Sequence, residues 1–235
     1  MAYRCEVTSV AGFVQQLAVG YIANGYYFYV TGRVPDQKDL AVVDQKLISQ
    51  YGIDLSKWSR ARRKKTGQAN VQYLRYNRFF VLLAQHGEHP FFIAEAGQVR
   101  DIRRHPLHFM GYSIGCRRAR DGQSFHASVR IQREIYLELK AQFQRTATRR
   151  SVEDLCRGLR AIEYERYAPV RDQLRGILRA VNRRRKIAGL ELVPPESLWL
   201  RRVPVKPFQT TPACANDGKN NSPHLLPWPL SLFRE

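Results

Sequence analysis

Apolar and polar positions over the first 131 residues predict strands separated by helices. Residues 26–34 are aromatic and β-branched, which is typical of a strand, and Pro35 ends this run. Residues 40–51 carry apolar side chains at helical spacing, and Gly52 suits the position just after a helix. Residues 70–84 predict a second strand, and the second half of that strand is apolar enough to be buried on both faces.

The next segments complete the expected order of elements. Residues 54–68 are polar and basic, so we expect a loop that leaves the core. A short helix is expected over 91–104, followed by a hairpin with arms Leu107–Arg117 and Phe125–Ile131 and a turn at 120–123. The order predicts an α+β fold: a small antiparallel or mixed sheet with split βαβ (ferredoxin-like) character.

From residue 132 the pattern changes to helices with apolar stripes. Ser151 suits the N-cap of one helix, Pro169 can begin the next, and Gly189 can end it. Prolines then accumulate towards the C-terminus, which indicates an extended or disordered tail. The sequence therefore predicts an α+β domain over 1–131, a basic helical segment over 132–200 and a tail over 201–235.

Composition supports a packed core and a strongly basic surface. Of the 235 residues 44% are hydrophobic, and 39 Lys and Arg against 20 Asp and Glu give a net charge of +19. The excess is segregated: residues 1–52 hold four basic and four acidic side chains, whereas residues 97–202 hold 24 and 11. A basic charge concentrated in this way indicates an anionic partner, and nucleic acid is the first class to consider.

Cysteine spacing and hydropathy exclude several classes of protein. Cys5, Cys116, Cys156 and Cys214 lie far apart, which argues against a zinc ribbon. The N-terminus lacks the basic and compact apolar regions of a signal peptide, and no apolar run is long enough to span a membrane. We expect a cytoplasmic protein with reduced thiols and no membrane partner. P-loop and α/β-hydrolase motifs are absent from the sequence.

Two basic motifs carry the nucleic-acid hypothesis. The helix expected after Pro169 has arginines at a spacing of four residues, and like charges at this spacing repel unless a polyanion lies against them. The loop expected before residue 70 combines cations with a tryptophan that can stack on an unpaired base. Each motif also fits an ordinary solvent-exposed surface. The residues predicted to bind nucleic acid are Lys57, Trp58, Arg60, Arg62, Arg63, Lys64, Lys65, Arg171, Arg175, Arg179, Arg183, Arg184, Arg185 and Lys186.

A run of aromatic residues offers a weaker indication of the same function. Tyr26, Tyr27, Phe28 and Tyr29 lie on the first expected strand, where neighbouring side chains face opposite sides. One pair is expected in the core, and the other pair could form an exposed stacking platform of the kind used by sheet-based RNA binders.

A cluster of histidines supports an alternative function. His86, Glu88 and His89 lie close together in sequence, and His105 and His108 form a second pair. Imidazole and carboxylate groups are common ligands of divalent metals, so these five residues are a candidate site for Mg²⁺ or Mn²⁺. A metal there could stabilise the charge that develops on a phosphodiester.

Tyr136, on the helix after the hairpin, is the candidate nucleophile of this alternative. Paired histidines with a helical tyrosine resemble the single-tyrosine, metal-dependent transposases and relaxases, which implies DNA processing within a mobile element. In that family one hydrophobic residue separates the histidines, whereas two residues separate both pairs here.

The sequence thus favours a nucleic-acid-binding protein that grips the phosphate backbone and needs no cofactor. The alternative is a metal-dependent nuclease or transposase-like enzyme. A third possibility is a basic scaffold that binds an acidic protein or ribosomal RNA. The choice between DNA and RNA and the oligomeric state stay open.

Overall fold

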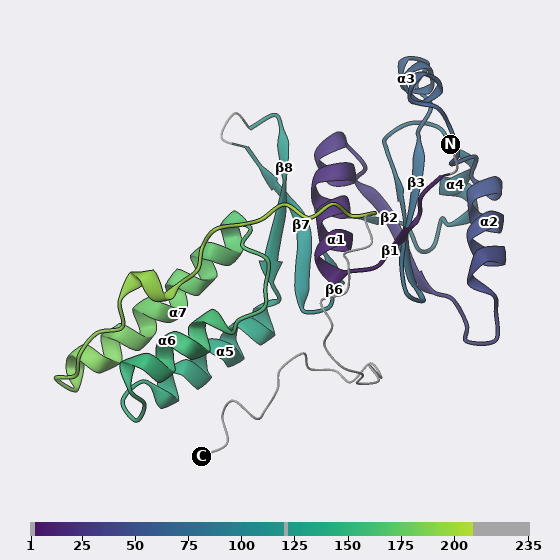
Figure 1. Ribbon diagram of the computed structural model, residues 1–235. Coiled ribbons are helices and arrows are strands. Elements are labelled where there is room, and N and C mark those ends of the chain that lie inside the picture. The colour runs from purple at the N-terminus through teal and green to yellow at the C-terminus, as the bar shows by residue number, and fades with distance from the viewer. Residues whose placement is uncertain (1–2, 120–121, 209–235) are drawn as a thin grey trace. The chain divides into compact units, whose positions relative to one another are not determined.

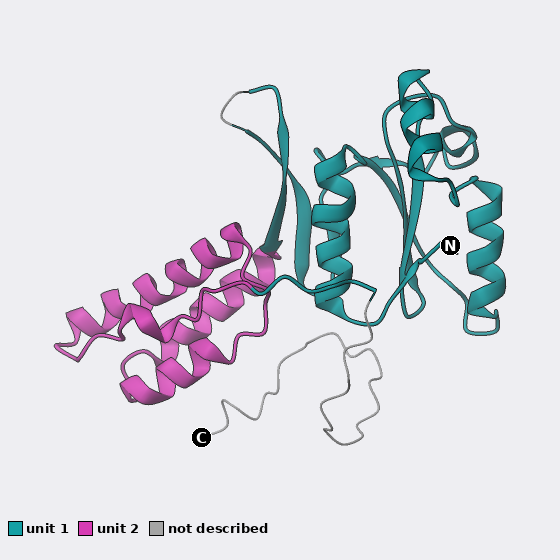
Figure 2. Cartoon of the chain, turned by 45° about the horizontal axis from the view of Figure 1, so that its top comes forward, with its two compact units in different colours: residues 1–130, 203–209 teal, residues 131–202, 210–235 magenta. Residues whose placement is uncertain are grey.

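The computed structural model describes residues 3–119 and 122–208. The chain divides into two units: residues 1–130 with 203–209 form unit 1, and residues 131–202 with 210–235 form unit 2 (Figure 2). The described residues after 202 are grouped with unit 1. The rest of the expected tail lies outside the described residues.

Unit 1 contains a five-stranded mixed sheet with the order β1-β3-β4-β2-β5. Strand β1 pairs parallel with β3, and the remaining pairs are antiparallel. Helix α2 lies between β2 and β3 in the chain, and helix α4 lies between β4 and β5. These elements are β1 (Glu6–Val7), β2 (Phe28–Arg33), α2 (Leu40–Gln50), β3 (Val71–Tyr76), β4 (Phe79–Ala84), α4 (Pro90–Ala94) and β5 (Arg100–Asp101).

The topology confirms the expected split βαβ character. Strands β2 and β3 are both antiparallel to β4, which lies between them, so α2 connects two parallel strands across a third. Helix α4 makes the same kind of connection from β4 to β5 around β2. The segment from β2 to β5 therefore has the β-α-β-β-α-β order of ferredoxin-like folds.

Helices cover both faces of this sheet (Figure 1). Helix α1 (Val10–Gln15) continues into the π-helical segment η1 (Gln16–Tyr21) and the short η2 (Ile22–Asn24) on one face, whereas α2 and α4 lie on the other. Side chains of a strand alternate between faces, and alternate residues pack with α2 and Phe91 of α4. This core cluster includes Val30, Val71, Tyr73, Leu82 and Ala84.

A second, three-stranded antiparallel sheet follows in the chain. It contains β6 (Leu107–Phe109), β7 (Tyr112–Arg118) and β8 (Phe125–Ile131). Phe109 of β6 packs against Phe13 of α1 with ring centroids 4.2 Å apart. The expected hairpin therefore contains an additional strand, and Met110 and Gly111, both with positive φ, make the turn between β6 and β7. Residues 120 and 121 of its expected turn lie outside the described residues.

Three sequence predictions for unit 1 are wrong in detail. The segment 70–84 forms two strands rather than one, because Asn77 adopts a φ of 49° and reverses the chain. The segment 54–68, expected as a loop, contains helix α3 (Lys57–Lys65). The helix expected over 91–104 is limited to α4, and β5 follows it.

Unit 2 contains three helices with a shared apolar core. Helices α5 (Arg133–Thr146), α6 (Val152–Arg160) and α7 (Ala168–Ile187) precede the short η3 (Pro195–Ser197). As predicted, the Ser151 hydroxyl caps α6 by accepting from the Asp154 amide at 3.1 Å, and Gly189 has a positive φ after α7. The buried apolar residues of unit 2 include Leu139, Phe143, Leu155, Leu159, Val170, Leu174, Ile177 and Val181.

No helix within the described ranges 3–119 and 122–208 is long and apolar enough to cross a lipid bilayer.

A buried ion pair connects α2 to the sheet of unit 1. The Nε–H of Arg75 is shared between the two carboxylate oxygens of Asp44, at 2.9 and 3.0 Å, and Nη2 donates to the same carboxylate at 2.8 Å. The Tyr73 hydroxyl donates to the same carboxylate at 2.6 Å, and the Cys5 thiol lies 3.4 Å from it. On its outer side Arg75 also contacts Glu6 at 3.3 Å. The carboxylate thus has enough donors to offset its loss of water.

Removing one partner of this pair is expected to destabilise unit 1 strongly. Arg75→Met leaves the Asp44 carboxylate buried without its cation, and such losses cost about 3–5 kcal/mol. Urea denaturation should show this decrease in the free energy of unfolding. The double variant Asp44→Leu/Arg75→Met should recover much of it, and an unchanged single variant would contradict the role of the pair.

Candidate nucleic-acid interface

Helix α3 concentrates more positive charge than any other helix of its length in the described residues. Six of its nine residues are Lys or Arg, none is acidic, and none is buried. In the described part of the chain no acidic side chain forms an ion pair with these cations. A helix that is polar all round and lacks pairs of opposite charge gains little stability from its own side chains.

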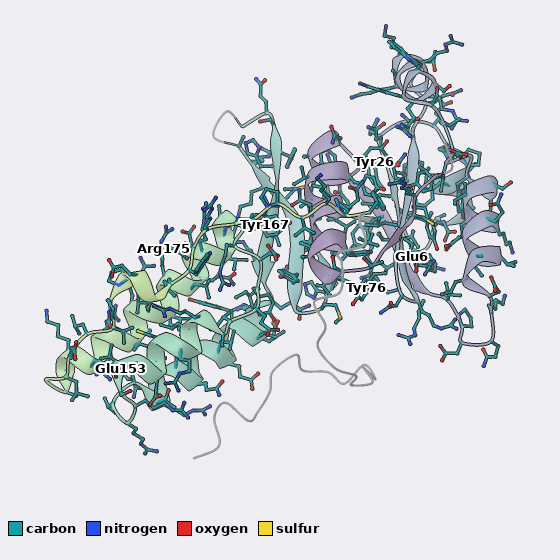
Figure 3. All side chains as sticks on the ribbon, in the orientation of Figure 1. Glu6, Tyr26, Tyr76, Glu153, Tyr167 and Arg175 are labelled. Carbon is teal, nitrogen blue, oxygen red and sulfur yellow. The ribbon has the colours of Figure 1, made fainter. Side chains whose placement is uncertain are left out.

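One face of α3 combines cations with an exposed aromatic ring. Positions i, i+4 and i+7 of a helix share a face, and Trp58, Arg62 and Lys65 have this spacing. All three are exposed, and Trp58 has 84% of its surface accessible. Nitrogen-tipped side chains project from this helix into solvent (Figure 3). The face therefore offers charge for phosphate together with a ring for stacking.

Hydrogen bonds to neighbouring backbone hold α3 in place. The Ser56 hydroxyl accepts from the Ser59 amide at 3.1 Å and caps the helix. Arg60 donates to the Leu55 carbonyl at 2.9 Å, and the Asn70 side-chain amide donates to the Arg60 carbonyl at 3.0 Å. The guanidinium of Arg60 is thus partly engaged in positioning the helix, while the outward face stays free of such contacts.

The segment that contains His86 and His89 pairs with the chain that leaves α3. The Glu88 amide donates to the Gly67 carbonyl, and the Ala69 amide donates to the Glu88 carbonyl, each at 3.0 Å. Gly87 has a φ of 134°, and a Cβ there would lie 2.4 Å from the Gly67 oxygen. Only glycine fits this approach of two backbones. These backbone contacts hold the chain that leaves α3 against the segment that precedes α4.

A groove of about 900 Å³ lies beside this junction. It is bounded by the end of α2, by Arg63 of α3 and by the first turn of α4. Phe92 and the exposed Ile93 give it an apolar wall, while Arg63 brings a positive charge to it. Its size is within the range of small-ligand sites, and an anionic ligand with an apolar part matches its lining.

The predicted metal site is not formed. Across residues 3–119 and 122–208, no three His, Cys, Asp or Glu side chains gather closely enough to hold a metal ion. His89 Nδ1 instead accepts from the Phe91 amide at 3.0 Å and caps α4. His86, His105 and His108 are exposed on separate segments. Of the four histidines, His89 therefore serves as a helix cap and the others lie at the surface. Glu88 contributes its backbone hydrogen bonds.

Tyr136 belongs to unit 2, whereas the four histidines belong to unit 1. A Cβ at position 176 of α7 would lie 2.6 Å from the Tyr136 hydroxyl, so Gly176 leaves space for this side chain. Lys140 lies 6.0 Å from the ring centroid. The contacts of Tyr136 indicate packing of α5 on α7 rather than a nucleophile in a prepared site.

The arginine row of α7 is largely exposed. Arg175, Arg179 and Arg183 face solvent, whereas Arg171 is partly buried. Arg175, visible on the surface in Figure 3, contacts Asp172 at 3.0 Å, and exposed pairs of this kind contribute little to stability. Arg184 and Lys186 are also exposed. Unit 2 therefore presents cations along one helix and at its C-terminal end.

Arg185, predicted to bind nucleic acid, is buried instead. Only 4% of its surface is accessible. Its Nη1 donates to the carbonyls of Ala147 at 2.7 Å and Arg150 at 2.9 Å, and its Nε donates to the Glu191 carbonyl. These carbonyls follow helices α5 and α7, so Arg185 satisfies chain ends that would otherwise lack donors. No local pattern in the sequence distinguishes Arg185 from the neighbouring arginines.

An ion pair near β5 that packs against aromatic rings was not predicted from the sequence. Asp101 accepts from Arg103 at 2.9, 3.1 and 2.7 Å, and the Arg103 guanidinium lies 4.8 Å from the Tyr27 ring and 5.5 Å from the Phe125 ring. Burial acts to raise the pKa of Asp101, but hydrogen bonds from Arg103 outweigh it and lower the pKa. The only sequence signal was the aromatic run that includes Tyr27.

Comparison of the chain with protein-family models, curated proteins and solved structures returns no match.

The cap formed by His89 predicts a pH-dependent stability. Burial and the positive charge of Arg63 lower the pKa of His89 below its ordinary value of 6.5. The unfolded chain then binds this proton more readily, so stability falls as the pH decreases from about 6.5 through the folded pKa. Asn accepts the same hydrogen bond without titrating. In thermal unfolding from pH 7.5 to about pH 5, His89→Asn should lose less stability than wild type, and identical profiles would contradict the role of the cap.

Adjacent arginines on α7 provide a matched test of burial. Arg185→Gln removes the charged donor from several buried carbonyls and should lower the free energy of unfolding by about 1.5–3 kcal/mol. Arg184→Gln changes the net charge equally but lies on the exposed surface, so its effect should stay within about 0.5 kcal/mol. Chemical denaturation of both variants compares them directly, and equal effects would show that burial of Arg185 does not matter.

Proposed function

We propose that this protein binds nucleic acid through the phosphate backbone, with α3 as the principal contact. The observation that carries the proposal is the exposed face of α3, where cations lie beside Trp58 and no acidic side chain among the described residues pairs with them. Phosphate oxygens supply the compensating charge, and arginine matches their geometry with two parallel hydrogen bonds.

The energetics of α3 favour a polyanionic ligand. Arg60 and Lys64 are separated by four residues, and Arg62 and Lys65 by three, so like charges are neighbours on the helix surface. Each such pair costs a few tenths of a kcal/mol in an isolated helix. The helix buries no residue that would offset this cost. Binding of a phosphate backbone relieves the repulsion, which an uncharged partner does not do.

The exposed arginines of α7 support the same function from the second unit. Arg175, Arg179 and Arg183 extend over two turns, and Arg184 and Lys186 follow near the end of the helix. Arginine side chains at this spacing can contact successive phosphates. Each unit thus presents exposed cations that are able to contact phosphate.

Neutralising the exposed cations of α3 should weaken binding and its salt dependence. The variant Arg62→Gln/Lys64→Gln/Lys65→Gln removes three phosphate contacts. The slope of log affinity against log salt should then decrease by about 2–3 in magnitude. Fluorescence anisotropy with labelled DNA and RNA at several salt concentrations measures both quantities.

A second triple variant controls for total charge. Arg33, Lys38 and Lys46 are exposed cations of unit 1 outside α3, and their replacement by Gln removes the same charge. This control should retain most of the affinity and slope. Equal losses in both variants would show that charge alone matters, and no binding by the wild-type chain at physiological salt would refute the proposed function. Binding only to acidic proteins would support a scaffold instead.

A further inference from the structure

Unit 1 contains a row of partly exposed aromatic side chains that the phosphate contacts do not use. The row begins at the groove beside α3 and extends to the β7–β8 hairpin. Its members come from α4, β2 and the residue before it, and β8, and each is partly exposed. Phe28 and Phe92 also pack against the core cluster on one side. We call this row the aromatic track; it consists of Phe92, Phe28, Tyr27 and Phe125.

Ring contacts make the track continuous. Phe92 and Phe28 meet edge to face with centroids 5.4 Å apart. The Arg103 guanidinium lies 5.6 Å from Phe28, 4.8 Å from Tyr27 and 5.5 Å from Phe125. Tyr27 and Phe125 lie 5.9 Å apart. One arginine therefore links three rings, and the fourth ring connects them to the groove at α3.

The charge within the track is held in a fixed position. Asp101 binds Arg103 through both carboxylate oxygens, so the guanidinium does not need to be ordered by a ligand. At the far end of the track Arg118 lies 5.8 Å from the Phe125 ring, and its side chain is exposed. One fixed cation and one exposed cation, each beside aromatic rings, suit a ligand with flat, polarisable groups and negative charge.

We infer that the aromatic track binds the bases of single-stranded nucleic acid, while α3 and Arg118 hold its phosphates. This inference rests on the proposed function and narrows its ligand. An unpaired base has a free face for stacking, whereas the bases of a duplex already stack on one another. DNA and RNA share this chemistry. A duplex is therefore expected to make only the phosphate contacts, whereas a single strand makes the phosphate contacts and also stacks its bases on the aromatic track.

The test removes the rings but keeps the apolar volume. Tyr27→Leu/Phe125→Leu abolishes stacking at two positions, and Tyr27→Phe/Phe125→Tyr retains both rings as the matched control. Anisotropy titrations use labelled single-stranded DNA, single-stranded RNA and duplex DNA of about 15 nucleotides. The leucine variant should bind single strands about ten-fold or more weakly. Its affinity for the duplex, its salt dependence and its thermal unfolding should match wild type.

A spectroscopic measurement detects base stacking directly, so the test does not rest on affinity alone. A single-stranded DNA that carries 2-aminopurine should show quenched base fluorescence on the wild-type protein and on the ring-retaining control. The leucine variant, measured at saturation, should show less quenching. A purely structural role of the two rings would change folding without changing the quenching of bound strands.

The outcomes separate the track from the proposed function. Loss of single-strand affinity and quenching in the leucine variant alone supports the inference. Unchanged binding and quenching, or equal losses on single strand and duplex, overturns it. If the α3 variant weakens binding of both ligands while the leucine variant weakens binding of neither, the result supports the proposed function and contradicts the role of the aromatic track. If the wild-type chain binds neither ligand, the proposed function itself fails.

Discussion

The ion pair between Asp44 and Arg75 is the interaction on which the rest of unit 1 depends. It joins α2 to β3 inside the core, and a buried pair is stable only when its geometry leaves no charge without a partner. The Tyr73 hydroxyl and the Cys5 thiol complete the shell around the carboxylate. Burial and the neighbouring carboxylate raise the pKa of Cys5 to about 12, so the thiol keeps the proton that it shares with Asp44. The position of α2 is thereby fixed, and the end of α2 forms one side of the groove beside α3.

Much of the fold could be predicted from the sequence because its signals are local. The Ser151 cap, the glycines after α2 and α7 and the apolar stripe of α7 each depend on a few neighbouring residues. The α+β class followed from the order of such segments. The hairpin at Asn77 was missed because a single residue with positive φ makes the turn, without the usual glycine. Helix α3 was missed because its signals are a cap and backbone contacts, with no apolar periodicity.

The candidate site was less predictable than the fold because its parts lie far apart in sequence. Charge density indicated where cations are concentrated, but it could not separate the buried Arg185 from the exposed Arg184. That difference depends on carbonyls contributed by residues more than thirty positions away. The prediction of a metal site at the histidines was wrong for a related reason, because residues that are close in sequence need not have side chains that are close in space. The aromatic run at Tyr27 was visible, whereas Arg103 and Phe125 became its partners only through folding.

The placement of α3 has a consequence for how this protein can change over evolutionary time. The helix is an insertion in the crossover from β2 to β3, and no side chain of it is buried. Mutations at its exposed positions change the charge and chemistry of the surface without disturbing the packing of the core. A side chain at Gly87, by contrast, would clash with backbone, because its Cβ would lie 2.4 Å from the Gly67 oxygen. The chain thus carries its most basic helix where substitution costs little packing, beside a glycine where a side chain has no room.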